Sequence, residues 1–86
     1  MIKTKTAADR RKKMEKYRRA LRNAVYWSDD LFNRGMHSDA YSQLVGALNT
    51  IDFLAANDNS VSVDDYMELL EEIHAARSAG MKKAGE

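Results

Sequence analysis

The feature that most constrains this chain is a 3-4 spacing of apolar and small residues that continues unbroken over about five helical turns. The spacing is made by Met14, Tyr17, Leu21, Ala24, Ser28 and Leu31, and it is widened by Val25 and Phe32. Residues spaced in this way lie on one face of an α-helix. The chain contains no proline that would interrupt a long helix. We therefore predict a helix over residues 7–34, ended by Gly35, which can adopt the left-handed cap conformation.

A second helix is predicted over residues 39–56. Ser38 is a good N-cap residue, and Asp39 is favourable beside the positive end of the helix dipole. The predicted core stripe consists of Tyr41, Leu44, Val45, Leu48, Ile51 and Ala55, broadened by Ala40, Ala47 and Leu54. The cluster Asn57-Asp58-Asn59 then predicts a turn.

The third predicted helix, over residues 63–78, has the strongest start signal. Ser62 with Asp65 resembles a capping box, and Val61 and Tyr66 are spaced to form a hydrophobic staple around it. The predicted buried stripe consists of Val63, Tyr66, Met67, Leu70 and Ile73. The opposite face is acidic and carries Asp64, Asp65, Glu68, Glu71 and Glu72.

Three amphipathic helices joined by short connections predict an all-α fold, an antiparallel three-helix bundle with a long basic first helix. The 86 residues suffice for one domain, which we place at residues 7–79. Residues 1–6 are expected to form a flexible N-terminal lead, and residues 80–86 a charged, flexible tail.

Composition excludes several classes of protein. The chain has no cysteine, so disulfide scaffolds, thiolate metal sites and cysteine nucleophiles are ruled out. No apolar run approaches the roughly 18 residues of a membrane span, and the N-terminus lacks the apolar core of a signal peptide. We expect a cytoplasmic protein that does not insert into a membrane.

Catalytic chemistry is weakly represented. Glu71 and His74 have the E-x-x-H spacing found in di-metal helical bundles, but those sites need a second such motif and further glutamates. We expect His74 to be a partly buried structural residue. The four glycines are dispersed and form no phosphate-binding loop. We predict no enzyme activity, catalytic residue, metal site, cofactor or small-molecule substrate.

The positive charge is concentrated at one end of the chain. Ten of the fourteen basic residues lie within residues 1–23, where Asp9 and Glu15 are the two acidic ones. Such a basic helix is typical of nucleic-acid binding, or of pairing with an acidic helix of its own or a neighbouring chain. For the first alternative the expected DNA- or RNA-binding residues are Arg11, Lys12, Lys16, Arg18, Arg19 and Arg22. Tyr26 and Trp27 could then stack on unpaired bases.

The second predicted helix has an unusual outward face. No charged residue occurs from Ala40 to Ile51, Gly46 would allow close approach of another backbone, and Phe53 would be an exposed aromatic anchor. Our main hypothesis is therefore a small non-enzymatic interaction module, an adaptor, inhibitor or regulator, that binds a protein partner or itself as a homodimer. The expected interface residues are Tyr26, Trp27, Gly46, Asn49 and Phe53.

Overall fold

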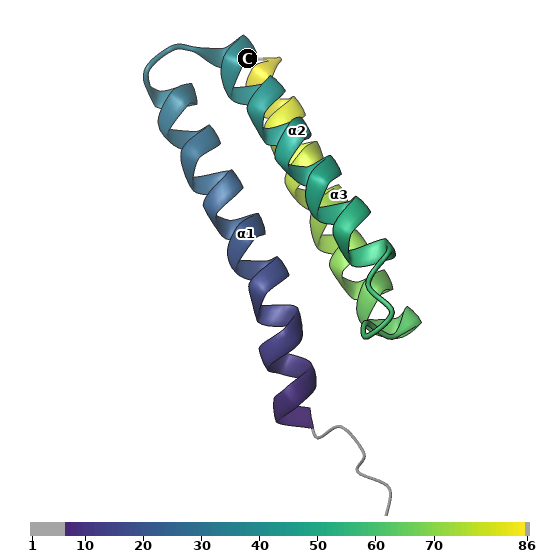
Figure 1. Ribbon diagram of the computed structural model, residues 1–86. Coiled ribbons are helices and arrows are strands. Elements are labelled where there is room, and N and C mark those ends of the chain that lie inside the picture. The colour runs from purple at the N-terminus through teal and green to yellow at the C-terminus, as the bar shows by residue number, and fades with distance from the viewer. Residues whose placement is uncertain (1–6, 86) are drawn as a thin grey trace, which may run out of the picture.

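The computed structural model describes residues 7–85 and the side chains of residues 12–85. It contains three helices, α1 (Ala7–Asn33), α2 (His37–Ala56) and α3 (Val63–Ala84), which run in alternating directions along one long axis (Figure 1). The predicted all-α, three-helix fold is confirmed, and every pair of helices is in contact. The predicted flexible lead at 1–6 lies outside the described residues. In the described part of the chain, no helix combines the length and hydrophobicity needed to cross a bilayer.

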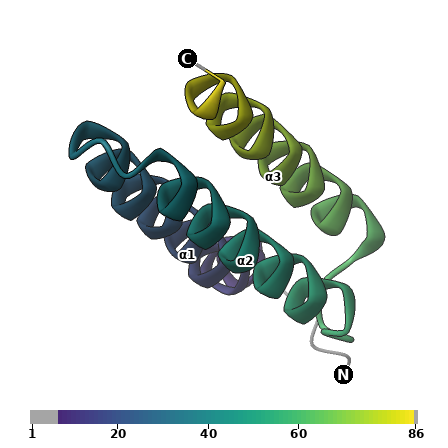
Figure 2. The ribbon, with the colours of Figure 1, turned by 90° about the horizontal axis from the view of Figure 1, so that it is seen from above.

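The bundle is more open on one side than on the others. The α2 helix packs most extensively against α1 and less against α3, while α1 and α3 have the least contact with each other. Viewed from above, α1 and α3 lie on different sides of α2 (Figure 2). One consequence is that α3 presents a broad surface to solvent on the side away from α1.

The turn from α1 to α2 is built as the glycine signal predicts. Gly35 has φ +84, a value that side chains disfavour and glycine tolerates. The Gly35 amide donates to the Phe32 carbonyl at 3.0 Å, and the Met36 amide donates to the Leu31 carbonyl at 3.0 Å. This pair of bonds is a Schellman motif, which satisfies carbonyls that the helix end leaves free.

The predicted N-cap of α2 is wrong. The helix begins at His37, so Met36 stands at the cap position, without a side-chain hydrogen bond. The Met36 carbonyl accepts the first helical bond, from the Ala40 amide at 2.9 Å. Because the Schellman turn directs the chain straight into α2, Ser38 already lies inside the helix.

The predicted start of α3 is confirmed. Ser62 Oγ accepts a hydrogen bond from the Asp65 amide at 3.1 Å, as expected for an N-cap. Val61 and Tyr66, the two residues predicted to form the hydrophobic staple, both pack against the core.

The core confirms the stripe predicted for α1. Met14, Tyr17, Leu21, Ser28 and Phe32 are all buried. The Ser28 hydroxyl donates to the Ala40 carbonyl at 3.1 Å, which satisfies its one buried polar group. The buried residues of α2 are Ala40, Leu44, Leu48, Ile51 and Ala55.

The stripe predicted for α3 is partly wrong. Leu69 and Ile73 are fully buried, with Tyr66 and Ala76 packed beside them, whereas Val63 is 76% exposed and Met67 is 50% exposed. The helix carries two 3-4 stripes side by side, and the bundle uses the one that contains Leu69. The sequence pattern of a single helix does not distinguish two adjacent stripes of similar hydrophobicity.

The predicted end of α3 at residue 78 is wrong. The α3 helix continues to Ala84, six residues beyond its predicted end, and Gly80 is buried. Lys83 forms a salt bridge with Asp29 of α1 and lies over the Phe32 ring, 5.8 Å from its centroid. These contacts give the last turns of α3 the tertiary support that the sequence pattern did not reveal.

A polar link joins the loop between α2 and α3 to α1. The Tyr17 hydroxyl donates to Asp58 Oδ2 at 2.5 Å, and the Ser60 amide donates to Asp58 Oδ1 at 2.9 Å. Burial, aided by the hydrogen bond to Asp58, raises the pKa of Tyr17 to about 12. Hydrogen bonds from Ser60 and then Tyr17 hold the pKa of Asp58 well below its usual range. Asp58 therefore stays ionised and links the loop between α2 and α3 to α1.

Candidate interaction surfaces

The residues predicted to form one protein interface lie on two separate faces. Tyr26 and Trp27 project from the outer side of α1, with their rings edge to face at a centroid distance of 5.8 Å. Gly46, Asn49 and Phe53 lie on the outer side of α2 and are exposed. The structure therefore separates the two aromatic groups, and one partner helix would not cover both.

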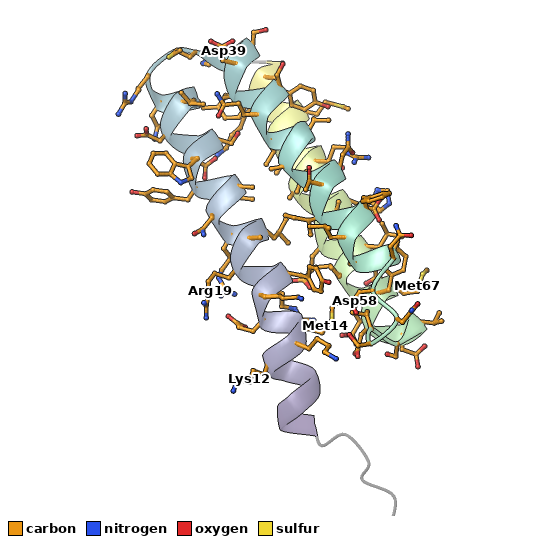
Figure 3. The ribbon with its side chains drawn as sticks, in the orientation of Figure 1. Lys12, Met14, Arg19, Asp39, Asp58 and Met67 are labelled. Atoms are coloured by element: carbon orange, nitrogen blue, oxygen red, sulfur yellow. The ribbon has the colours of Figure 1, made fainter. Side chains whose placement is uncertain are left out.

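Cations and aromatics share the outer side of α1. Lys12, Arg19 and Tyr26 are seven residues apart, two helical turns, and all three are exposed. Figure 3 shows Lys12 and Arg19 directed away from α2 and α3. With the exposed side chain of Trp27, they form a surface that we call the α1 outer face.

Several of the predicted nucleic-acid-binding cations already have carboxylate partners. Arg18 Nε lies 3.0 Å from Glu72, and Arg18 Nη2 lies 3.5 Å from Glu68. Lys16 lies 3.9 Å from Asp58. The expectation that the basic helix meets the acidic third helix of its own chain thus holds for Arg18.

Arg22 is also paired, with Glu15 of its own helix, at 2.5 Å. The hydrogen bond and the charge of Arg22 lower the pKa of Glu15. No salt bridge joins Lys12 or Arg19 to another described side chain. The Arg11 side chain lies outside the described part.

A surface that the sequence analysis missed spans α2 and α3. The second stripe of α3 follows a regular 4-3 spacing and consists of Val63, Met67, Leu70, His74, Arg77 and Met81. Tyr66 and Arg77 bond to α2, whereas Glu68, Glu72 and Lys83 pair with α1. These contacts place the second stripe beside α2 and away from α1, and Figure 3 shows Met67 pointing away from α1.

Asn49 of α2 accepts a hydrogen bond from Arg77 Nη2 at 3.0 Å, so it borders the second stripe directly. Phe53 lies one turn further along the same side of α2. We call the second stripe together with Asn49 and Phe53 the α2/α3 face. Its largest apolar groups are well exposed, with Phe53 at 66% and Met81 at 58% in addition to Val63 and Met67. None of these eight residues is acidic.

Arg77 is the one strong cation of this face. Its side chain is half-buried, and its Nε is buried without a hydrogen-bond partner. No described carboxylate forms a salt bridge with it. The Nε–H group of this guanidinium therefore lacks a hydrogen-bond acceptor among the described residues. The 4-3 spacing of the second stripe is present in the sequence. It was not recognised as an apolar stripe because two of its positions are occupied by the polar residues His74 and Arg77.

The residues considered for metal or catalytic chemistry do not assemble into a site. Among the described side chains, no three His, Asp or Glu residues are grouped as metal ligands. The prediction that His74 is partly buried is wrong, because it is exposed on the second stripe. His37 lies against Phe32 at a centroid distance of 5.5 Å.

Two grooves lie along α1 and α3, the two helices that have the least contact with each other. A groove of about 500 Å³ runs beside Leu21, Tyr26 and Ala76, and a smaller one of about 260 Å³ lies near Ser28, Phe32 and Gly80. Their charged residues, Arg22, Asp29, Glu72 and Lys83, all take part in the salt bridges described above. The remaining residues that line the two grooves are mainly apolar.

Comparisons of this chain with models of protein families, with curated proteins and with solved structures found no match.

Proposed function

We propose that this protein is a non-enzymatic interaction module that associates with itself through the α2/α3 face. The observation that carries the proposal is the α2/α3 face, which contains no acidic residue and exposes Val63, Met67 and Met81 of α3 together with Phe53 of α2. Large apolar groups gathered on one side of a small domain are typical of a surface that another protein covers. A homodimer is the simplest such assembly, because one face serves both subunits.

The energetics support association. Covering an exposed phenylalanine is worth on the order of 2 kcal/mol, and covering methionine or valine side chains adds to this. Each 1.4 kcal/mol changes a dissociation constant about tenfold. A three-helix domain of this size also has a small core, so a further apolar contact stabilises the folded chain.

The proposal is tested by sedimentation equilibrium over a wide range of protein concentration. The wild type is expected to be a dimer, and Phe53→Asp is expected to be a folded monomer because it buries a charge in the apolar contact. Tyr26→Asp is the matched control, since Tyr26 is equally an exposed aromatic but lies on the α1 outer face. A wild type that stays monomeric at high concentration would refute self-association, and loss of the dimer in Tyr26→Asp alone would move the interface to α1.

A second candidate function is favoured by the α1 outer face, where Lys12 and Arg19 are followed by Tyr26 and Trp27. We propose single-stranded nucleic acid as its ligand, with cations on phosphates and aromatic rings on bases. This candidate needs no covering of the α2/α3 face, so both functions are compatible in one molecule.

Titration of a labelled single-stranded oligonucleotide at several salt concentrations tests this candidate. Arg19→Glu is expected to weaken binding and to lower the salt slope by about one phosphate contact. Lys82→Glu, an equal charge reversal at an exposed position of α3, is expected to leave both unchanged. The absence of binding by the wild type at low salt would refute the candidate.

A further inference from the structure

A polar side chain lies between the cations and the aromatic rings of the α1 outer face. Asn23 lies one helical turn after Arg19, on the same side of α1. Tyr26 and Trp27 follow it by three and four residues, so both are its neighbours on the helix surface. Asn23 is exposed, and its amide forms no hydrogen bond with a described residue. The acceptor oxygen and the N–H donors of this amide are therefore accessible to a ligand.

The two aromatic rings extend toward Asn23. Side chains on an α-helix lean toward its N-terminus, so the rings of Tyr26 and Trp27 cover the turn that contains Asn23. Tyr26 is 69% exposed and Trp27 is 61% exposed, and their planes stand at 80° to each other, so each presents ring surface to solvent. The edge of a base stacked on Trp27 would lie within reach of the Asn23 amide.

The charges along α1 favour an anionic strand on this side. The acidic side chains of α1 that the structure describes are all in salt bridges: Glu15, Asp29 and Asp30 pair with Arg22, Lys83 and Arg34. Lys12 and Arg19 form no salt bridge with a described side chain. A strand along the α1 outer face therefore meets two available cations and carboxylates that are already neutralised.

The length of the α1 outer face matches a short single strand. Lys12 and Tyr26 are 14 residues apart, which is roughly 21 Å along the helix axis. Stacked nucleotides advance about 3.4 Å each along a strand, so about six of them span this distance. The cations lie at one end of this span and the rings at the other, so phosphates and the stacked base contact different parts of it.

We propose that Asn23 is the base-reading residue of this site and hydrogen-bonds the edge of an adenine that stacks on Trp27. This inference rests on the proposed binding of single-stranded nucleic acid and adds the base that the site selects. The adenine edge presents the N6 amino donor beside a ring-nitrogen acceptor. The Asn23 amide presents the complementary acceptor and donor, so two parallel hydrogen bonds form. In an unpaired strand no complementary base competes for this edge.

Two strands that differ only in the amino group of each base test the contact. Hexanucleotides of adenine and of unsubstituted purine both stack, but purine lacks the N6 amino group. The wild type is expected to bind the adenine strand about fivefold or more tightly. Trp27 is the one tryptophan of the chain, so quenching of its fluorescence measures binding at this site. The same preference is expected for DNA and RNA forms, because the amide contacts the base and not the sugar.

Substitutions separate base reading from backbone binding. Asn23→Ala is expected to bind both strands as the wild type binds the purine strand, with an unchanged salt slope. Asn59→Ala, the same substitution at an exposed position of the loop between α2 and α3, is expected to keep the wild-type preference. Arg19→Glu is expected to weaken binding of both strands alike, since its contact is with phosphate.

The outcomes separate this proposal from the candidate function beneath it. A wild type that binds neither strand at low salt overturns both. Equal binding of the two strands by the wild type leaves nucleic acid as the ligand and overturns base reading by Asn23. An adenine preference that persists in Asn23→Ala also overturns it and assigns the reading to another residue.

Discussion

Leu69→Ala is expected to lower the free energy of unfolding by about 2–5 kcal/mol, whereas Met67→Ala is expected to lower it by less than about 1 kcal/mol. Leu69 is 0% exposed and is among the largest fully buried side chains, so its truncation leaves a cavity between the helices. Met67, two residues away, is half exposed and leaves none. Since small domains have total stabilities of about 5–15 kcal/mol, Leu69→Ala would remove a large part of it.

Urea unfolding followed by circular dichroism measures both changes. Low protein concentration is needed, because association would add a contribution from Met67. Near-equal losses, or a larger loss for Met67→Ala, would show that the side of α3 that carries Met67 faces the core, and would contradict the orientation in which Leu69 is buried.

Gly80→Ala is expected to be less stable than Gly46→Ala by about 1–3 kcal/mol. Both glycines lie inside helices, so alanine gains about 1 kcal/mol of helix propensity at either position. A Cβ at Gly80 would lie 2.4 Å from Leu44 Cδ2, and Leu44 is itself buried, so it has little room to move. A Cβ at Gly46 would meet nothing within 4 Å.

The glycine comparison is made by thermal and urea unfolding of the two variants beside the wild type. Gly46→Ala should be more stable than wild type, and Gly80→Ala should be less stable than Gly46→Ala by the stated margin. Equal stabilisation by both substitutions would mean that the last turns of α3 are not packed on α2, as the prediction of a flexible tail from residue 80 implied.

Local signals in the sequence were reliable where one short segment contains all the interacting groups. Gly35 supplies the positive φ of its turn by itself, and Ser62 caps α3 with an amide three residues away. The stripe of α1 from Met14 to Phe32 was likewise correct, because the opposite face of that helix is too basic to be buried. Fold class and helix number follow from signals of this kind.

The candidate surfaces were only partly predictable, for a reason visible in individual residues. Phe53 was correctly expected to be exposed, because it lies off the apolar stripe of α2, and Tyr26 and Trp27 are exposed as well. Their division between two faces depends on how α1 and α2 are rotated against each other. The pairing of Arg18 with Glu72 joins residues 54 positions apart, and no local pattern reports it.

The sequence by itself determined the three helices, their turns and the basic character of the first, because periodicity, capping and charge act over a few residues. The tertiary structure alone decided which of the two stripes of α3 enters the core and that its last turns are supported by Leu44 and Asp29. It also decided that Arg77 lies half-buried on an acid-free face. These outcomes depend on where α1 and α2 leave space, and a helix with two adjacent apolar stripes satisfies its own local preferences with either one inside.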